Sequence, residues 1–402
     1  MKFKGELKAF QKEGLAFALE HPYHINNFEA GLGKTITSLA VAYETKSKTL
    51  VVCPAFLKQN WFKEIAKFTE GLGITVTSYS SLHKLNPREK FDMVICDECH
   101  YLKNHKAKRT EALHDLLITK KPKYFMGLSG TPVSNRVSEF WSLLQACYHG
   151  GHYDEFKPYY RLYYKFCNTF SNERTFEVNG VPIVRFDGLK NIERLKSLIA
   201  PVLIRRRADQ VLDLPDEVEM NVVGKVKKYD DDLKKAFELF KVDANDPAYM
   251  SLKSSNALAK VSTTIQHAKE LIEQGYRPLI FTCHRASAEE ISRRIDCLKI
   301  DGNVSADNRQ SIIDGFNDGV GSALVCTIGS ASTGFNITGT NYTIFNDLPF
   351  VPAEVEQAKK RTLRIGQTKT CFYYYIFTSE FDEKLSDMIQ RKSNDINKIY
   401  AR

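Results

Sequence analysis

The chain has 402 residues, of which 43% are hydrophobic and 26% charged, and its net charge is +9. This length predicts two or three domains with substantial cores, and the basic excess is compatible with a polyanionic partner. The sequence lacks an apolar run of the roughly 18–20 residues that a membrane helix needs, and it opens without the apolar core of a signal peptide. We therefore expect an intracellular protein, in a cytoplasm or nucleoid, with no membrane association.

The nine cysteines are odd in number and scattered along the chain. This distribution predicts reduced, mostly buried thiols, because several of them lie in apolar, strand-like segments. Residues 96–100 also match the C-x-x-C-H pattern of haem attachment. Because that attachment requires an exported chain, we favour the second interpretation of these residues, given below.

Short apolar segments alternate with helix-like segments along the first half of the chain. The predicted strands are residues 25–28, 49–53, 74–77, 93–96 and 124–128, and the predicted helices include residues 35–45 and 61–68. Such alternation is typical of βαβ units and a parallel sheet. We expect a first α/β lobe over residues 1–200. Within it, residues from about 135 to 200 are rich in Tyr and Phe and form a helical insertion whose aromatic side chains serve as core rather than as a base-stacking platform.

A second α/β lobe is predicted after a basic linker. The linker spans residues 201–219 and holds Arg205-Arg206-Arg207. The second lobe spans residues 220–402, with a short helical insertion at about 228–274. Its predicted strands are residues 279–283, 323–326, 343–345 and 372–377. The sequence thus predicts an α/β fold with two parallel-sheet lobes joined by a hinge.

A glycine-rich loop follows the first strand and precedes a helix. Its residues are Glu29, Ala30, Gly31, Leu32, Gly33, Lys34 and Thr35. Glycines allow backbone N–H groups to approach phosphate oxygens, and the helix N-terminus favours an anion. Lys34 can reach the β- and γ-phosphates of a nucleotide, and the Thr35 hydroxyl can bind Mg²⁺. The loop therefore predicts an ATP site, although Phe28 occupies the place of the first glycine in the strict pattern.

Two carboxylates end the strand at residues 93–96. At the carboxyl edge of a parallel sheet they would lie beside the phosphate loop. We expect Asp97 to hold Mg²⁺ and Glu98 to orient and deprotonate the attacking water. Adjacent strand residues point to opposite faces, so both can serve the site only if the strand end is distorted.

Two further segments carry polar residues that fit the same chemistry. Ser129-Gly130-Thr131-Pro132 follows an apolar strand and could sense the γ-phosphate, although a plain strand-to-helix turn explains it equally well. Arg361 and Arg364 are three residues apart, so on a helix they would share a face and suit a phosphate chain. They belong to the other lobe and would reach the nucleotide only on closure. The alternative is a solvated basic helix that binds nucleic-acid backbone.

The ordered series of motifs resembles the Swi/Snf-like branch of superfamily-two helicases. The matching segments, in chain order, are Leu7–Gln11, Glu29–Thr37, Val51–Trp61, Asp97–Asn104, Leu128–Asn135, Leu279–His284, Ser330–Asn336 and Gln357–Gln367. A finer likeness, to annealing helicases, is carried by the segments Phe186–Asn191, Leu203–Arg207 and Leu214–Pro215. The compact size of the chain is similar to that of phage-encoded branch-migrating helicases. The resemblance implies two RecA-like lobes, and a host cytoplasm if the chain is phage-encoded.

The resemblance also implies roles for individual residues. Gln11 would read adenine. Weaker expectations concern DNA contacts, assigned to Pro54, His284 and Ser330, and coupling, assigned to Ser129, Thr131, Gly334 and Gln357. Departures from the family pattern are Phe28, Cys99, Lys360 and Leu363. Because the arginine pair is retained, these departures leave the expected hydrolysis of ATP intact.

The function implied is that of an ATP- and Mg²⁺-dependent DNA helicase or translocase. Its partner would be duplex, forked or four-way DNA, and no obligate protein partner is evident in the sequence. The outcome would be branch migration, fork remodelling or unwinding. The alternatives are a translocase that displaces or loads proteins without separating strands, an RNA motor, and an inactive ATPase that acts as a DNA-binding scaffold.

Overall fold

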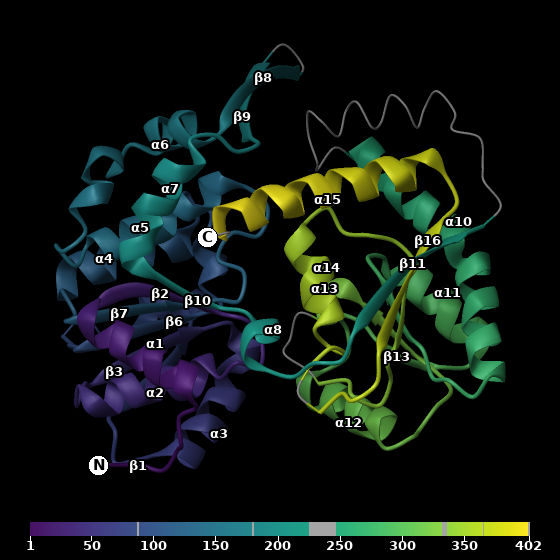
Figure 1. The fold of residues 1–402 in the computed structure, drawn as a ribbon, viewed down its shortest axis with the longest axis horizontal. Helices are drawn as coiled ribbons and strands as arrows, with labels where there is room; N and C mark the ends of the chain where they lie inside the picture. Colours follow the sequence, from purple (N-terminus) through teal and green to yellow (C-terminus); the bar gives the residue numbers. More distant parts are fainter. Residues whose placement is uncertain (87, 179–180, 225–246, 332–335, 365, 401–402) are drawn as a thin grey trace. The chain divides into compact units, whose positions relative to one another are not determined.

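The computed structural model describes residues 1–86, 88–178, 181–224, 247–331, 336–364 and 366–400. Its contacts divide the chain into two compact units. The first comprises residues 1–174, 185–212 and 394–402, and the second comprises residues 175–184 and 213–393. Each unit is built on its own six-stranded sheet (Figure 1). The chain therefore enters the second unit twice, briefly at residues 175–184 and then at 213–393, and returns to the first unit each time.

The sheet of the first unit is parallel throughout, with the order β10-β2-β7-β6-β3-β5. Its strands are β2 (Tyr23–Phe28), β3 (Thr49–Cys53), β5 (Ile74–Ser78), β6 (Met93–Asp97), β7 (Tyr124–Leu128) and β10 (Leu203–Arg206). Strands β2, β3 and β6 are buried at every residue, as expected for a sheet covered on both faces. The strands predicted within residues 25–128 are confirmed.

Helices cover both faces of this sheet (Figure 1). They are α1 (Ala9–Glu20), α2 (Lys34–Glu44), α3 (Lys58–Phe68), α4 (Lys108–Lys120), α5 (Phe140–Tyr148), α6 (Tyr163–Phe170), α7 (Ile192–Ile199) and the short α8 (Ala208–Val211). On one face Val51 and Ile95 pack with Leu39 and Trp61, from α2 and α3. On the other face the alternate strand residues pack against α4 and α5. A small antiparallel pair, β1 (Lys2–Phe3) with β4 (Thr69–Glu70), also belongs to this unit. A second two-stranded sheet is formed by β8 (Asn172–Val178) and β9 (Val181–Asp187), of which residues 175–184 belong to the second unit.

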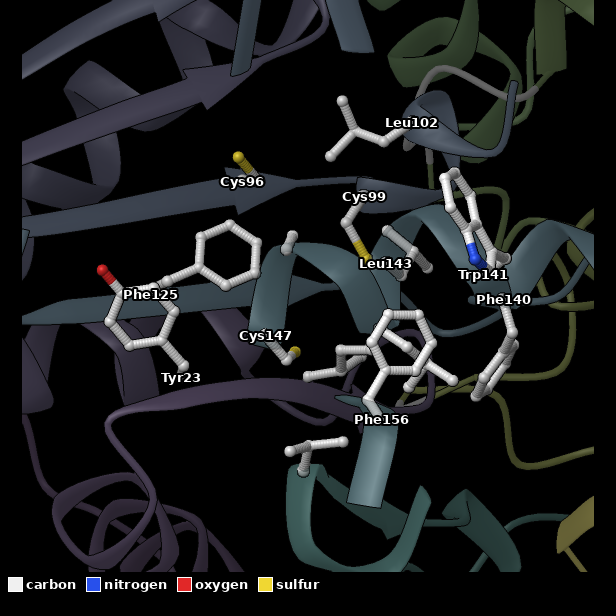
Figure 2. Packing of buried hydrophobic residues seen from close by; sticks show 14 of the residues in the cluster. Tyr23, Cys96, Cys99, Leu102, Phe125, Phe140, Trp141, Leu143, Cys147 and Phe156 are labelled. Carbon is white, nitrogen blue, oxygen red and sulfur yellow. The ribbon is translucent and has the colours of Figure 1, made fainter. Parts of the chain in front are cut away.

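The aromatic-rich segment after β7 contributes to the core of the first unit, as predicted. Phe156, Phe166 and Phe170 are fully buried and join a cluster that reaches Phe125 on strand β7. Figure 2 shows part of this cluster, including Phe140 and other residues of α5. These rings therefore pack inward as core, whereas Tyr164 of the same segment is 60% exposed.

The predicted basic linker at residues 201–219 is not a linker throughout. Residues 203–206 form β10, which pairs in parallel with β2 at the edge of the first sheet, with Arg205 opposite Asn27. The charges did not prevent strand formation because each arginine finds a partner. Arg205 lies near Glu29, Arg206 binds Glu13, and Arg207 binds Asp209.

The second sheet is also parallel, with the order β11-β16-β15-β12-β14-β13. Its strands are β11 (Glu217–Val223), β12 (Leu279–Thr282), β13 (Leu298–Ile300), β14 (Leu324–Thr327), β15 (Tyr342–Phe345) and β16 (Cys371–Phe377). Its helices are α10 (Pro247–Glu273), α11 (Arg285–Ile295), α12 (Ala306–Asn317), α13 (Ile328–Ala331), α14 (Pro352–Lys359) and α15 (Glu380–Tyr400). The strands predicted here are present, and the predicted fold class is correct. Of the helical insertion predicted at about 228–274, residues 228–246 lie outside the described residues, and the rest corresponds to α10. The last residues of α15 belong to the first unit.

All nine cysteines are free thiols, and seven of them are buried. Cys96 and Cys99 pack inside the hydrophobic cluster with Leu143 and Cys147 (Figure 2). Their burial in the core favours the carboxylate-motif interpretation of residues 96–100 over haem attachment. Across the described part of the chain, no helix combines the length and apolar character needed to cross a membrane.

Candidate functional site

The phosphate loop joins the carboxyl end of β2 to the N-terminus of α2. Gly31 and Gly33 take positive φ angles of 82° and 76°, which glycine adopts without strain. The Lys34 ammonium donates hydrogen bonds to the carbonyls of Phe28 (2.9 Å) and Glu29 (3.2 Å). Its charge is therefore held at the centre of the turn, where an anion bound by the loop would lie.

Gln11 fastens α1 to this loop. Its amide nitrogen donates to the Leu32 carbonyl at 3.0 Å, and its amide oxygen accepts from the backbone of Lys8 at 2.9 Å. A Cβ atom on Gly33 would collide with the Gln11 amide, so a side chain there would have to displace the amide from the loop, in addition to the strain at the positive φ angle. The predicted role of Gln11 in reading adenine stays a prediction, and its contact with the loop supports a place beside the nucleotide.

Glu29 faces the edge strand β10. One carboxylate oxygen accepts from the backbone of Ala208 at 3.1 Å, and the other lies 3.8 Å from the guanidinium of Arg205. Sequence reasoning placed Glu29 in the phosphate loop but missed Arg205 as its partner. The missing information is the pairing of β2 with β10, which are far apart in the sequence.

Asp97 and Glu98 end β6 at the same edge of the sheet. Asp97 is buried, and its carboxylate accepts hydrogen bonds from the Trp61 indole (2.8 Å) and from the Glu98 backbone (2.9 Å). Burial and the neighbouring Glu98 charge raise its pKa to about 6. Glu98 takes a positive φ of 48°, a left-handed conformation that is uncommon for a residue with a side chain. The distortion predicted for this strand end is thus present.

His100 links Glu98 to the segment after β7. Its Nδ1 lies 3.2 Å from a Glu98 carboxylate oxygen and 3.2 Å from the Ser129 hydroxyl. The Ser129 oxygen accepts in turn from the Thr131 backbone at 3.1 Å. Strand β7 lies between β2 and β6 in the sheet, so these residues join the phosphate loop and the two carboxylates along one edge. We did not select His100 from the sequence, although its place two residues after Glu98 in the motif was a usable signal.

Thr35 lies in the first turn of α2, directly after Lys34, and is partly exposed. Together with Asp97 it offers hard oxygen ligands of the kind that Mg²⁺ prefers. Among the residues that the structure describes, no group of three or more His, Cys, Asp or Glu side chains could hold a metal ion. This donor set suits a Mg²⁺ ion shared with nucleotide phosphates, because that ion normally keeps only one or two protein ligands.

The two predicted arginine fingers belong to the second unit. Helix α14 ends at Lys359, so Arg361 and Arg364 lie in the turns that follow it rather than on one helix face, which corrects that expectation. The Arg361 carbonyl accepts from the backbone of Ile337 at 3.0 Å, and the Arg364 guanidinium donates to the Asn336 side chain. The two arginines therefore contact Asn336, the last residue of the motif that begins at Ser330, and Ile337, the residue after it.

The remaining predicted residues lie near the carboxyl ends of strands. Pro54 is buried directly after β3, and His284 is partly buried after β12, with its Nε2 3.9 Å from Asp347. The buried Ser330 hydroxyl bonds to the carbonyls of Ile300 (3.2 Å) and Thr327 (2.7 Å). Gln357 lies on α14, and Gly334 lies outside the described residues. The predicted DNA-contact and coupling roles of these residues are untested.

Comparison with known proteins identifies the family. Residues 10–85 and 70–276 match the SNF2-related domain, and residues 260–366 match the helicase conserved C-terminal domain. The chain is 27% identical over 97% of its length to the SWI/SNF-related matrix-associated actin-dependent regulator of chromatin subfamily A-like protein 1 homolog of Caenorhabditis elegans. It is 25% identical over 98% of its length to the DNA annealing helicase and endonuclease ZRANB3 of Bos taurus. The chain covers 61% and 40% of those two proteins.

Among solved structures, the SWI2/SNF2 ATPase core of Sulfolobus solfataricus in complex with dsDNA aligns over 99% of this chain and 97% of that chain. The identity is 21% and the TM-score 0.43. The resemblance noted in the sequence is confirmed by the two domain matches, of which the first alone spans well over half of the residues. This chain belongs to the SNF2-related domain family.

Proposed function

We propose that this chain is a DNA-dependent ATPase that uses ATP and Mg²⁺ to move on duplex or branched DNA. The observation that carries the proposal is the carboxyl edge of the first sheet. There the phosphate loop, the distorted Asp97-Glu98 end of β6 and the Ser129 segment follow three adjacent strands. The family assignment points to the same activity.

The nucleotide phosphates would bind to the loop from Glu29 to Thr35. Backbone N–H groups at the N-terminus of α2 and the Lys34 ammonium would bind the anion. When bound, Mg²⁺ would neutralise charge on the phosphates, and Thr35 and Asp97 are the residues that fit it. The raised pKa of Asp97 supports this fit, since a buried carboxylate with little compensation from the protein favours a nearby cation.

Glu98 is the proposed general base. Its carboxylate is partly exposed at the strand end, and the His100 ring holds it at 3.2 Å. From there it can accept a proton from a water molecule positioned by the same carboxylate. The contact of Glu98 with His100, and the hydrogen bonds from His100 to Ser129 and from Thr131 to Ser129, give a route by which the state of the site could reach the chain after β7.

Two parts of the proposal rest on the sequence motifs. Arg361 and Arg364 would stabilise charge on the phosphates during turnover, as arginine fingers do. Gln357 and Gly334 would couple that step to movement. DNA would be held mainly through its backbone, with contacts near Pro54, His284 and Ser330, so binding should weaken steeply with salt.

The preferred DNA is proposed from the relatives. One of them is named a DNA annealing helicase, and the finer motif likeness points to that subgroup. We therefore propose branched DNA, forked or four-way, as the preferred partner, with branch migration or fork remodelling as the outcome. A translocase that displaces or loads proteins without strand separation is the alternative.

The test is the ATPase rate across single-stranded, duplex, forked and four-way DNA, with duplex RNA as a further arm. We expect stimulation by DNA, greatest with branched DNA, and its loss in Lys34→Ala but not in Lys12→Ala, which changes an exposed lysine on α1. Stimulation that survives in Lys34→Ala, or that RNA produces equally, would overturn the proposal. Movement of a four-way junction separates branch migration from translocation alone.

A further inference from the structure

The arginine triplet at residues 205–207, of which the first two lie on β10, has no role in the function proposed so far. Of its three members, Arg205 is the most enclosed, with 21% of its side chain exposed. It pairs opposite Asn27 in the strand register, which places it directly beside the strand that leads into the phosphate loop. The other two arginines form ion pairs with Glu13 and Asp209 at the surface.

The Glu29 side chain creates an electrostatic problem for a loop that binds phosphate. Its carboxylate is 14% exposed and lies two residues before Gly31. A negative charge at this position would repel a polyanionic nucleotide unless it is compensated. The Arg205 guanidinium, 3.8 Å from one carboxylate oxygen, supplies the positive charge, while the Ala208 amide binds the other oxygen at 3.1 Å.

Arg205 also reaches the segment that carries the predicted sensor. Its guanidinium donates to the Asn27 side-chain oxygen at 3.4 Å. The Asn27 amide nitrogen then donates to the carbonyls of Ser129 and Gly130, each at 2.9 Å. One guanidinium therefore contacts both the acid of the phosphate loop and the asparagine that fixes the chain after β7.

The position of Arg205 is itself fixed by an aromatic ring. Its guanidinium lies 4.1 Å from the ring centroid of Tyr400, near the end of α15. The neighbouring Ile399 is 2% exposed and packs in the core of the first unit. Such cation–π contacts stabilise a guanidinium most when it is withdrawn from water.

We propose that Arg205 is a positioning residue of the nucleotide site, which neutralises Glu29 beside the phosphate loop and so sets the affinity for ATP, and that the Tyr400 ring holds it in place. This inference rests on the proposed ATPase function. The residue acts through Glu29 and Asn27 and does not itself take part in hydrolysis.

A double-mutant cycle tests the charge compensation. Arg205→Gln should raise the dissociation constant of a fluorescent ATP analogue, and the KM for ATP, about tenfold, since the Glu29 charge beside the phosphate loop then lacks the guanidinium that offsets it. Turnover at saturating ATP should change far less. Adding Glu29→Gln to Arg205→Gln should restore the affinity to within about threefold of the native chain, because the repulsive charge is gone. Glu29→Gln alone completes the cycle.

Arg207→Gln is the matched control, because it removes a surface arginine from the same segment and should leave affinity and KM unchanged. Tyr400→Leu should raise the KM in the same direction as Arg205→Gln by a few-fold, whereas Tyr400→Phe keeps the ring and should not. An unchanged KM in Arg205→Gln, or a double variant as weak as the single one, would overturn the inference. A native chain that neither binds nor hydrolyses ATP would instead overturn the proposed function.

Discussion

Two buried aspartates occupy comparable places in the two units and behave in opposite ways. Asp97 ends β6 at the carboxyl edge of the first sheet, and Asp347 follows β15 at the carboxyl edge of the second. Burial raises the pKa of Asp97 to about 6. Burial also works to raise the pKa of Asp347, but the charges of Lys253 and Lys260, with hydrogen bonds from Thr282 and Asn346, lower it overall.

The difference lies in how completely the protein compensates each charge. Asp347 accepts hydrogen bonds from the Thr282 hydroxyl (2.5 Å), the Cys283 backbone and the Asn346 amide, so its charge is satisfied within the fold. Asp97 has Glu98 as its neighbour, and its two side-chain hydrogen bonds do not offset burial and that charge. The carboxyl edge of the first sheet thus holds a carboxylate, Asp97, that a bound cation would stabilise. At the same edge of the second sheet, the charge of Asp347 is already stabilised by polar groups of the protein.

The largest effect that this comparison predicts is on turnover. Glu98→Gln keeps the shape of the left-handed strand end but removes the proposed base, so we expect kcat for DNA-stimulated ATP hydrolysis to fall about a thousandfold. ATP binding, followed with a fluorescent analogue, should persist. Glu111→Gln on α4 is the surface control. A fall in kcat smaller than tenfold would show that Glu98 is not the general base.

The second effect is on the stability of the second unit. Asp347→Ala leaves the Thr282 and Cys283 donors unsatisfied and removes a charge that faces Lys253 and Lys260, which should cost about 3 kcal/mol. Thermal unfolding and hydrogen exchange at β12 and β15 would measure the loss. Asp387→Ala, at an exposed site on α15, should change neither. If Asp347→Ala were as stable as the native chain, the protein would not stabilise the charge of Asp347 more than that of Asp97.

The third effect is a gain in stability, opposite in sign to the loss expected for Asp347→Ala. The pKa of Asp97 is raised on folding, so its ionised form reduces stability above pH 6, and this cost fades as the pH falls towards 4. Asp97→Asn should therefore stabilise the nucleotide-free chain by about 2 kcal/mol at pH 7.5, with a smaller gain at pH 4.5, while Mg²⁺-dependent hydrolysis is lost. Melting temperatures at the two pH values provide the measurement. A destabilised variant at pH 7.5 would show that Asp97 is compensated in the way Asp347 is.

The smallest effect concerns the indole that binds Asp97. The hydrogen bond from Trp61 lowers the pKa of Asp97, so Trp61→Phe should move the acid limb of the ATPase pH profile to higher pH, by an amount equivalent to about 1 kcal/mol. The rate should fall more at pH 6 than at pH 8. Trp141→Phe makes the same change at an indole bound to the Tyr159 carbonyl, and an equal response in both variants would contradict the assignment.

Local sequence patterns predicted the parts of the site that lie within one βα unit. The phosphate loop, the carboxylate pair and the strands before them could be identified because each depends on neighbours in the sequence. Even the distortion at Glu98 followed from the need to use two adjacent strand residues. The prediction lacked one strand of the first sheet, β10. This strand pairs with a strand about 180 residues earlier in the sequence, and its arginines suggested an exposed linker and not the edge of a sheet.

The contacts that tune the site were not predictable in this way. The indole of Trp61 meets Asp97 and the ring of Tyr400 meets Arg205 only because distant elements pack together. For Arg361 and Arg364, the local sequence pattern itself led to a wrong prediction. A spacing of three residues suggested a helix, but the helix ends at Lys359 and the chain turns before Arg361.

The division of the chain has a consequence for its synthesis. The first unit includes residues 394–402, after the whole of the second. A nascent chain that has emerged only to residue 212 holds all six strands of the first sheet but lacks Ile399, which is buried in the finished unit, and the half-buried Tyr400. Domains usually fold in order as they leave the ribosome. Here the first sheet can assemble early, whereas the completion of the unit's core, and with it the ring that holds Arg205, waits until residues 394–402 have been synthesised.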